Sequence, residues 1–343
     1  METKIKLTDE FFELLNRYPS PHNGQPIELK QTSETNFDLY FDTKRGLQAT
    51  EVSYLFSFVT MGLFVKYFSI CAEAFGYKST FNVSLPEVAQ LRHEGLLHFA
   101  SCTIQSSSNG PNGNLLQMLR FRQTSRKKYD EGLNEALSSR TIEFAAKHHM
   151  ELVRMNRKDT HQAIWLNQRA VFDDMFDDAV RIELNNWLRY NKNEKESKMD
   201  GLAYDCMELN GPAMKFIVKH YKILRMPGIR RVLKKYYLRT MSDNSDVYYL
   251  LTPFSNEQES FAVGQVVMQI WADIASEGYY IHPFGTIMSN VAAHKDFLKL
   301  ARIEHEDVHE NFLVFIYRAG RSQKPHVSMR IPVSHHLLRS KHV

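Results

Sequence analysis

Residues 18–26 combine a rigid backbone with polar side chains that can recognise a flat, polar ring. Pro19 and Pro21 fix φ at alternate positions, and Pro26 keeps the residue before it out of the helical region, so a rigid, extended loop is predicted. The polar side chains of this loop are those of Ser20, His22, Asn23 and Gln25. Carboxamides both donate and accept hydrogen bonds, which suits a heterocycle edged with N–H and C=O groups. A turn that only joins a helix to a strand is the alternative interpretation.

A second polar segment, at residues 119–130, places Arg122, Thr124 and Arg126 at alternate positions. Side chains at alternate positions of an extended segment point to the same side. Two guanidiniums and a hydroxyl on one side favour a phosphate ligand, because arginine forms bidentate, charge-assisted hydrogen bonds. A solvated basic surface is the alternative interpretation.

The composition limits the classes of protein to which the chain can belong. It has 343 residues, enough for one large domain or two smaller ones, and 43% of them are hydrophobic, as in globular proteins. A net charge of +4 makes no case for nucleic acid, and no apolar run is expected to reach the roughly 18 residues that span a bilayer. The widely spaced Cys71, Cys102 and Cys206 predict neither a disulfide framework nor a metal site, and they favour the reducing cytoplasm.

Two stretches of the chain share one pattern: a long helix that is apolar on nearly all sides, a strand-like stretch, a polar region and a final strand. The helices are predicted at residues 51–75 and 257–277, and the final strands at 97–104 and 312–317. The spacing from Gly62 to Gly76 equals that from Gly264 to Gly278, and a tyrosine follows the second glycine of each pair. This agreement favours an internal duplication, with coincidence as the alternative because glycine often ends helices.

The run Pro-Ser-Pro-His-Asn-Gly-Gln-Pro at residues 19–26 resembles the Pro-Ser-x-x-Asn-x-Gln-Pro loop of the FMN-dependent nitroreductase superfamily. The histidine before the asparagine resembles that of the Acg branch, whose members carry a duplicated nitroreductase-like fold. The resemblance implies that Ser20, Asn23 and Gln25 line the flavin. Pro21 stands where many members have a second serine, and Ile27 stands where most have tryptophan.

Two basic segments also resemble parts of that superfamily. Arg122, Thr124 and Arg126 match its Arg-x-Ser/Thr-x-Arg/Lys segment, which implies contacts with the ribityl phosphate and with the pyrimidine edge of the ring. Ser-Met-Arg-Ile-Pro at residues 328–332 resembles a Lys-x-Arg-x-Pro segment that supplies basic phosphate contacts. This match implies that Arg330 binds the phosphate, while Ser328 replaces the first basic residue.

The run His-Pro-Phe-Gly at residues 282–285 resembles the segment after the second long helix of nitroreductases, where a backbone N–H meets flavin N5. The resemblance implies that Gly285 is this donor, beside Pro283 and Phe284, since glycine lets the backbone approach the ring closely. It calls for no catalytic side chain and no metal.

The superfamily places the arginine segment before the Pro-Ser loop, whereas here the order is inverted. Each half is therefore expected to keep what the other has lost, so that one chain folds as a pseudo-dimer with one composite FMN site. The implied fold is α+β and nitroreductase-like, with a mixed or antiparallel sheet flanked by helices. The predicted parts are a first half at 8–105, a linker at 106–114 and a second half at 115–338. A monomer is expected, with a homodimer as the alternative.

The second half contains a helical insertion. A helical pattern covers residues 163–190, a polar loop is predicted at 191–198, and a lid-like segment follows at 199–239. Residues 215–239 hold nine Lys or Arg and no acidic residue, in an amphipathic pattern that breaks at Pro227 and Gly228. Three interpretations are open: a solvated basic hairpin, a lid over the flavin as in the Acg branch, or a contact with a membrane surface or nucleic acid.

Taken together, these resemblances imply a cytoplasmic, FMN-dependent oxidoreductase. It would move hydride from NAD(P)H through flavin N5 to a small-molecule acceptor of the nitro or quinone type. Neither nucleic acid nor stable membrane insertion is expected. The alternative is an FMN storage or sequestering protein in which the lid-like segment closes over the flavin and prevents turnover. A third hypothesis is an interaction module that has lost FMN.

Overall fold

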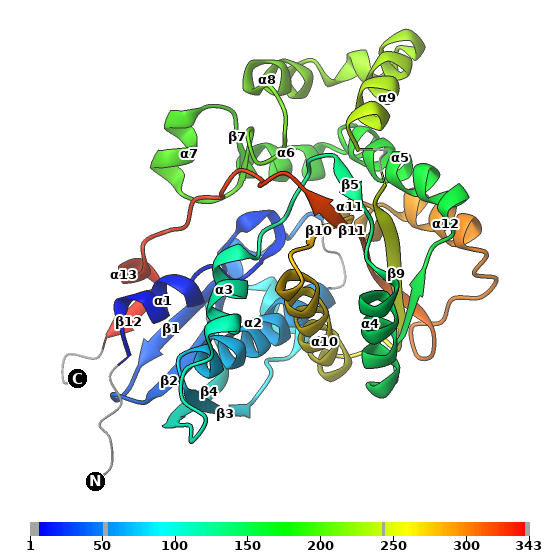
Figure 1. The fold of residues 1–343 in the computed structure, drawn as a ribbon. Helices are drawn as coiled ribbons and strands as arrows, with labels where there is room; N and C mark the ends of the chain where they lie inside the picture. The colour runs from blue at the N-terminus through cyan, green and yellow to red at the C-terminus, as the bar shows by residue number, and fades with distance from the viewer. Residues whose placement is uncertain (1–6, 51–53, 242–243, 340–343) are drawn as a thin grey trace. The chain divides into compact units, whose positions relative to one another are not determined.

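The computed structural model describes residues 7–50, 54–241 and 244–339. It has an α+β fold whose described strands pair mostly antiparallel (Figure 1). The chain divides into two compact units, each of which is described on its own. The first unit takes the described residues of Met1–Arg122, Asn256–Ser276 and Met329–Val343, and the second those of Gln123–Ser255 and Glu277–Ser328. The halves predicted at 8–105 and 115–338 are the two copies of a sequence repeat, which is a different division from that into compact units. These halves stay a prediction.

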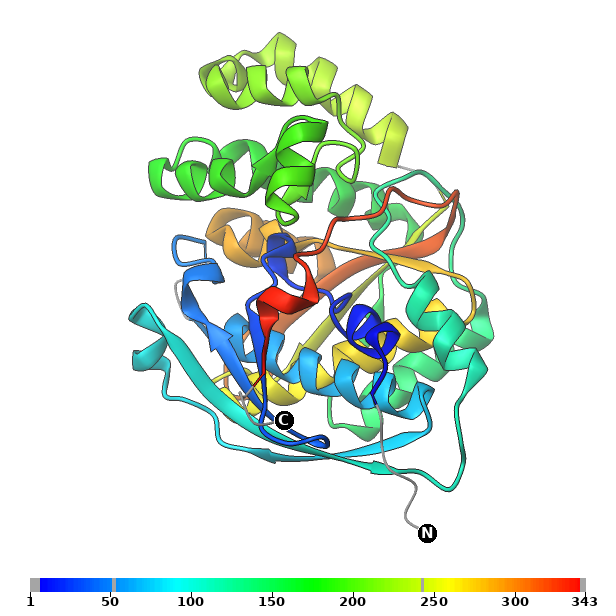
Figure 2. The ribbon, with the colours of Figure 1, turned by 90° about the vertical axis from the view of Figure 1, so that its left-hand side faces the viewer.

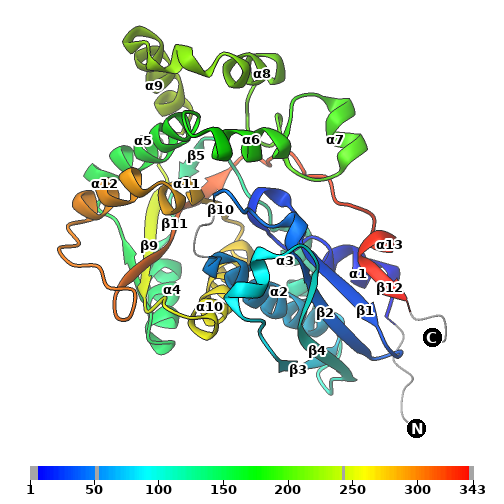
Figure 3. The ribbon, with the colours of Figure 1, turned by 180° about the vertical axis from the view of Figure 1, so that it is seen from behind.

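The first unit is built on a five-stranded sheet in the order β12-β1-β2-β4-β3 (Figure 3). Strands β1 and β12 pair parallel, and the other neighbours pair antiparallel. The strands are β1 (Ile27–Gln31), β2 (Asn36–Asp42), β3 (Tyr77–Val83), β4 (Leu96–Ser106) and β12 (Leu337–Arg339). The helices and 3-10 turns are α1 (Asp9–Leu15), η1 (Pro21–Asn23), η2 (Thr43–Arg45), α2 (Leu55–Ala74), η3 (Val88–Arg92), α3 (Gly113–Phe121), α10 (Glu257–Ser276) and α13 (Val333–His336).

Helices α2 and α10 lie side by side in the core of the first unit and approach each other at two glycines. A Cβ atom on Gly62 would lie 1.9 Å from the carbonyl oxygen of Phe261, and one on Gly264 would lie 2.0 Å from that of Val59. Each glycine therefore faces the residue three positions before the other glycine, so the crossing is reciprocal. Both helices are buried along most of their length, which confirms the prediction of central helices.

Glycine ends both long helices as the sequence predicts. Gly76 and Gly278 each have φ of +78°, a left-handed conformation that glycine adopts without steric cost. Helix α2 ends just before this turn and β3 begins at Tyr77, the predicted start of a strand. Residues 51–53, where the prediction places the start of α2, lie outside the described residues.

Helix α2 is long and apolar enough to cross a membrane, so the expectation that no segment reaches that length is wrong. Most of the helix is buried inside the structure. Such burial is typical of the core helix of a globular protein, which passes the same test of length and composition.

The second unit contains the antiparallel sheet β10-β11-β9-β6, with β5 paired to β11, and a small parallel pair, β7-β8. Its strands are β5 (Tyr129–Glu131), β6 (Glu151–Arg154), β7 (Leu188–Arg189), β8 (Leu202–Ala203), β9 (Asp246–Thr252), β10 (Tyr280–Pro283) and β11 (Phe312–Ser322). Its helices are α4 (Glu135–Lys147), α5 (Arg157–Asp174), α6 (Asp178–Trp187), α7 (Lys192–Lys198), α8 (Gly211–Lys219), the 3-10 turn η4 (Tyr221–Arg225), α9 (Pro227–Met241), α11 (Gly285–Ser289) and α12 (Val291–Ala301).

Two sequence predictions for the second unit need correction. The helical pattern at 163–190 forms two helices rather than one, because Asp177 accepts hydrogen bonds from the first N–H groups of α6 and starts a new helix. The loop predicted at 191–198 is a helix, since Asn191 caps α7 by accepting from the N–H of Glu194. The predicted break at Pro227 is confirmed, because this proline begins α9 after η4.

Candidate functional site

The loop that joins α1 to β1, called the Pro-Ser loop (residues 18–26), has a strained backbone. His22, Asn23 and Gln25 have φ of +49°, +54° and +54°, and the first two belong to the 3-10 turn η1. The prediction of an extended loop is therefore wrong, because the chain turns tightly between the prolines. Residues other than glycine seldom adopt positive φ, and they do so mainly where surrounding contacts over-determine the backbone, as at functional sites.

Side chains within the Pro-Ser loop supply these contacts. The hydroxyl of Ser20 accepts a hydrogen bond from the Gln25 N–H at 3.0 Å. The hydroxyl of Tyr18 accepts one from the Ile27 N–H at 2.8 Å, which fixes the entry into β1. The Tyr18 ring is buried and packs edge-on against Phe64 of α2, with 4.8 Å between the ring centroids. The loop is thus anchored on the helical core of the first unit.

The two carboxamides of the loop bind the segment around residue 330. Asn23 donates through Nδ2 to the carbonyl oxygen of Met329 at 3.1 Å. Gln25, which is completely buried, accepts through Oε1 from the Ile331 N–H at 3.0 Å. These bonds join residues that are about three hundred positions apart. They bring Asn23 and Gln25 beside Arg330, which lies between the two bonded residues Met329 and Ile331. Whether Ser20, Asn23 and Gln25 contact a flavin stays a prediction.

Two guanidiniums converge beside this loop. Arg122, which follows α3, donates to the carbonyl oxygen of Arg17. Arg330 donates to the same oxygen at 3.4 Å and also to Oδ1 of Asn23. The first unit therefore gathers five predicted site residues, namely Ser20, Asn23, Gln25, Arg122 and Arg330. Among the described residues, the acceptor that the two cations share is a neutral carbonyl.

Arg122 is held between aromatic rings. Its guanidinium carbon lies 5.6 Å from the ring centroid of Tyr67 on α2 and 5.1 Å from that of Trp271 on α10. The side chains of Arg122 and Trp271 are almost fully buried, at 3% and 4% exposed. Nε of Arg122 and Nε1 of Trp271 have no hydrogen-bond partner in the described part of the chain. Buried donors of this kind are costly unless a ligand or water accepts from them.

The charge of this arginine cluster (Arg17, Arg122 and Arg330) is not neutralised by the described residues, none of whose carboxylates pairs with it. Burial, together with the positive charges of Arg122 and Arg17, lowers the pKa of Arg330 to about 10. Burial likewise lowers the pKa of Arg122, to which Arg17 adds. A buried cation without a counterion is expensive, so the cluster is suited to an anion with more than one charge.

The second unit holds the other half of the arginine segment. Thr124 forms a parallel β-bridge with Ile281, and the N–H of Ser125 donates to the Ile281 carbonyl at 3.3 Å. Arg126 donates to the carbonyl oxygen of Cys206 at 3.3 Å, and burial lowers the pKa of its guanidinium. Thr124 and Arg126 thus lie beside the strand that leads into the predicted Pro283-Phe284-Gly285 segment.

That segment joins β10 to α11. Pro283 ends the strand, and the buried Phe284 donates its N–H to the carbonyl oxygen of Ile316 at 2.8 Å. Gly285 begins α11, and its N–H makes no hydrogen bond within the described residues. A Cβ atom at this position would meet nothing within 4 Å. The N–H predicted to face flavin N5 is therefore available to a ligand, as the first N–H groups of a helix commonly are.

Sequence reasoning missed a buried pair in the second unit. Arg318 of β11 is fully buried, donates to Nδ1 of His282 at 3.2 Å, and stacks at 4.3 Å on the Tyr129 ring. Burial, Arg126 and Arg318 hold the pKa of His282 well below its usual range, so its ring is neutral and accepts at Nδ1. Arg17 and Trp271 of the first unit were missed as well, because a carbonyl acceptor and an isolated indole leave no motif in a sequence.

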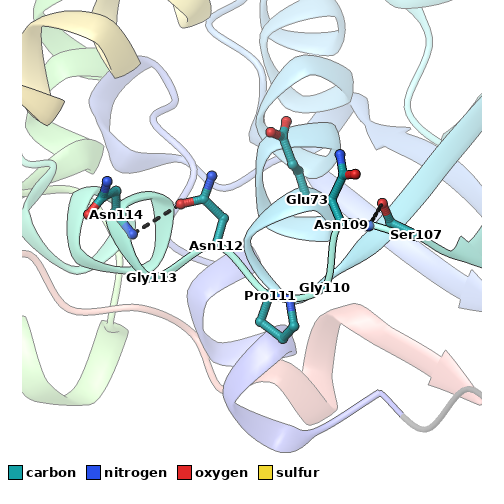
Figure 4. A pocket seen from close by; sticks show the side chains of 8 residues that line it. All are labelled: Glu73, Ser107, Asn109, Gly110, Pro111, Asn112, Gly113 and Asn114. Carbon is teal, nitrogen blue, oxygen red and sulfur yellow. Dashed lines mark hydrogen bonds between the residues drawn. The ribbon is translucent and has the colours of Figure 1, made fainter.

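The first unit also has a hollow away from the arginine cluster. It has a volume of about 310 Å³ and is lined by Glu73, Ser107 and residues 109–114, in the stretch that precedes α3 (Figure 4). Its lining includes one carboxylate and no cation, so it does not suit a phosphate. No group of three or more metal-ligating side chains is found in the described residues.

Comparisons with known proteins leave the family open. No family model matches the chain, and no curated protein matches it. Among solved structures, it is similar to the crystal structure of the FMN-dependent nitroreductase NfnB from Mycobacterium smegmatis in complex with NADPH. The similarity has a TM-score of 0.36 at 11% sequence identity and covers 61% of this chain and 88% of that one. A likeness of this strength does not identify a family or a function.

Proposed function

We propose that the chain binds FMN and acts as a nitroreductase-like oxidoreductase. The observation that carries the proposal is the arginine cluster, in which Arg122 and Arg330 converge on one carbonyl oxygen without a carboxylate among the described residues. Arg330 also bonds to Asn23, so the cluster is attached to the loop that resembles the flavin-lining loop of nitroreductases. A phosphate group and a flat polar ring are the two parts of FMN that such neighbours suit.

The residues fit the phosphate. Arg122 and Arg330 can each donate charge-assisted hydrogen bonds, and the Nε atom of Arg122 is a buried donor that still needs an acceptor. A phosphate monoester carries close to two negative charges at neutral pH, which matches the uncompensated charge of the cluster. Ser20 and Asn23 would stand at the edge of the ring, and Gln25 would hold the loop in place.

The chemistry that FMN supplies when bound is hydride acceptance from NAD(P)H and electron delivery to a nitro or quinone-type acceptor. The contribution of the chain is to bind and orient. The cluster would fix the phosphate. The Gly285 N–H would donate to the ring nitrogen that takes up hydride. Roles for Thr124, Arg126, Pro283 and Phe284 at the same flavin stay predictions.

We also propose that the chain arose by internal duplication and folds as a pseudo-dimer with one FMN. The reciprocal crossing at Gly62 and Gly264 supports this, because two copies related by a local two-fold axis would make each such contact twice. One FMN per chain, measured by absorbance after denaturation, together with the mass in solution from light scattering, tests the proposal. Two FMN per chain would contradict it.

The function is tested by adding FMN to the purified protein, removing the excess, and recording the visible spectrum before and after NADPH is added without oxygen. A yellow protein that bleaches is a working reductase. A yellow protein that does not bleach binds FMN without turnover, as a storage protein would. A protein that retains no FMN overturns the proposal.

A further inference from the structure

The segment formed by α8, η4 and α9 in the second unit has an inner face that packs against other parts of this unit. Leu224 is fully buried in a cluster with Phe172 of α5, and Leu233 of α9 packs against the same cluster. Arg230 of α9 forms an ion pair with Asp173 of α5. Helix α9 is therefore packed on α5 by both apolar and charged contacts. Helices α8 and α9 are the yellow-green helices at the top of Figure 2.

The opposite face of this segment exposes large apolar side chains. Phe216 of α8, Met226 before α9, and Val232 and Tyr236 of α9 are 55%, 56%, 66% and 57% exposed. Val232 and Tyr236 are four positions apart, so they form a stripe along one side of the helix. Four such residues within twenty-one positions are unusual on a surface that meets only water.

Cations surround these apolar residues. Exposed lysines and arginines of the segment include Lys215, Lys219, Lys222, Arg231, Lys235 and Arg239. None of these six forms an ion pair within the described residues, and residues 215–239 contain no carboxylate. We call Phe216, Met226, Val232 and Tyr236, with these six cations, the basic face. It presents unneutralised positive charge and apolar surface together.

We propose that the basic face docks on the surface of a bilayer that contains anionic lipids. Cations attract lipid phosphates, and apolar side chains enter the boundary between headgroups and acyl chains, so a membrane surface satisfies both features at once. A nucleic acid would satisfy the charge but would leave Val232 and Met226 in water. The docking is peripheral and reversible, and it does not depend on the proposed binding of FMN.

The test is sedimentation of the full chain with vesicles, which needs no knowledge of its activity. We expect at least tenfold more binding to vesicles of phosphatidylglycerol and phosphatidylcholine than to pure phosphatidylcholine, with a marked loss at high salt. Val232→Ser and the double variant Lys235→Glu, Arg239→Glu should each weaken binding several-fold. Val291→Ser, at an exposed valine of α12, is the matched control and should bind as the unaltered chain does.

Three results would overturn the proposal. The first is equal binding to charged and uncharged vesicles, and the second is no binding to either. The third is a Val232→Ser variant that binds anionic vesicles normally while a short duplex DNA competes fully for the chain, since this would assign the face to nucleic acid by charge alone. The circular dichroism of each variant shows that a loss of binding is not a loss of folding.

Discussion

Arg330 donates a hydrogen bond to Oδ1 of Asn23, and this bond joins the arginine cluster to the Pro-Ser loop. The same asparagine donates through Nδ2 to the carbonyl oxygen of Met329. Both polar atoms of its carboxamide therefore bond to the 329–331 segment. Arg330 thus supplies positive charge for a phosphate and also holds the Pro-Ser loop in position. Changes at either residue should therefore affect phosphate binding and loop geometry together.

Replacement of Arg122 by alanine should weaken FMN binding by about 1.5–3 kcal/mol, the range for a hydrogen bond to a charged group. This corresponds to an increase in Kd of about tenfold to more than a hundredfold, measured by quenching of flavin fluorescence. Arg120→Ala is the matched control, because Arg120 lies in the last turn of α3, two positions before Arg122, and pairs with Glu10 at the surface. Equal affinities for the two variants would remove Arg122 from the site.

Inorganic phosphate should stabilise the ligand-free protein, because it neutralises the arginine cluster in the folded state alone. We expect Tm to rise more with phosphate than with chloride at equal ionic strength, and the difference to vanish in Arg330→Met. The pKa of Arg330 is lowered to about 10, so its charge is present below that pH and is lost above it. The stabilisation by phosphate should accordingly decline as the pH rises through about 10. A shift that Arg330→Met retains would contradict this assignment.

Alanine at Gly62 or Gly264 should destabilise the protein, because the added methyl group would overlap a backbone carbonyl of the facing helix. We expect a loss of about 1–3 kcal/mol or more in the free energy of unfolding, as for other overpacked cores. Gly113→Ala is the control, because a Cβ atom there meets nothing within 4 Å and the residue begins α3. Chemical denaturation with all three variants would measure the difference, and equal stabilities would contradict the close crossing.

His336 should make the first unit sensitive to acid. Its ring is buried in an apolar pocket with Tyr18 and Phe64, and both ring nitrogens lack partners among the described residues. Burial, with Arg45 and other cations, lowers its pKa to about 4. The unfolded chain, with an ordinary pKa near 6.5, then binds the proton first, so stability is lost as the pH falls from about 6.5 to 4.

The variant His336→Leu should flatten the dependence of stability on pH across this window, and His93→Leu, at an exposed histidine of the first unit, should leave it unchanged. Urea unfolding at several pH values measures both slopes. If the slope is the same in the two variants, another group is responsible for the acid sensitivity.

Much of the fold is predictable from local patterns. Helix α2 and its end at Gly76 were predictable because a helix that is apolar on all sides followed by a left-handed glycine is a strong local signal. Polar and apolar residues alternate at 36–42, a pattern that indicates a strand, and β2 has these bounds. Local signals failed at residues 191–198, where a capping asparagine makes a helix out of a highly charged sequence.

The candidate site was predictable in part. Asn23 and Arg330 could be named because each lies in a run that resembles a family motif. The contact between them could not be named, since it links positions at opposite ends of the chain. The carbonyl of Arg17 leaves no trace in a sequence, because every residue has one. Arg318 was overlooked for a different reason, as an arginine in a strand is usually at the surface and here it is fully buried.

The placement of α10 also bears on how the protein is made. Helix α2 belongs to the early part of the chain, and the helix that covers its glycine face is synthesised only after most of the second unit. A ribosome therefore releases α2 while its partner does not yet exist. The contact between α2 and α10 can form only after α10 has been synthesised, and β12 joins the sheet of the first unit later still.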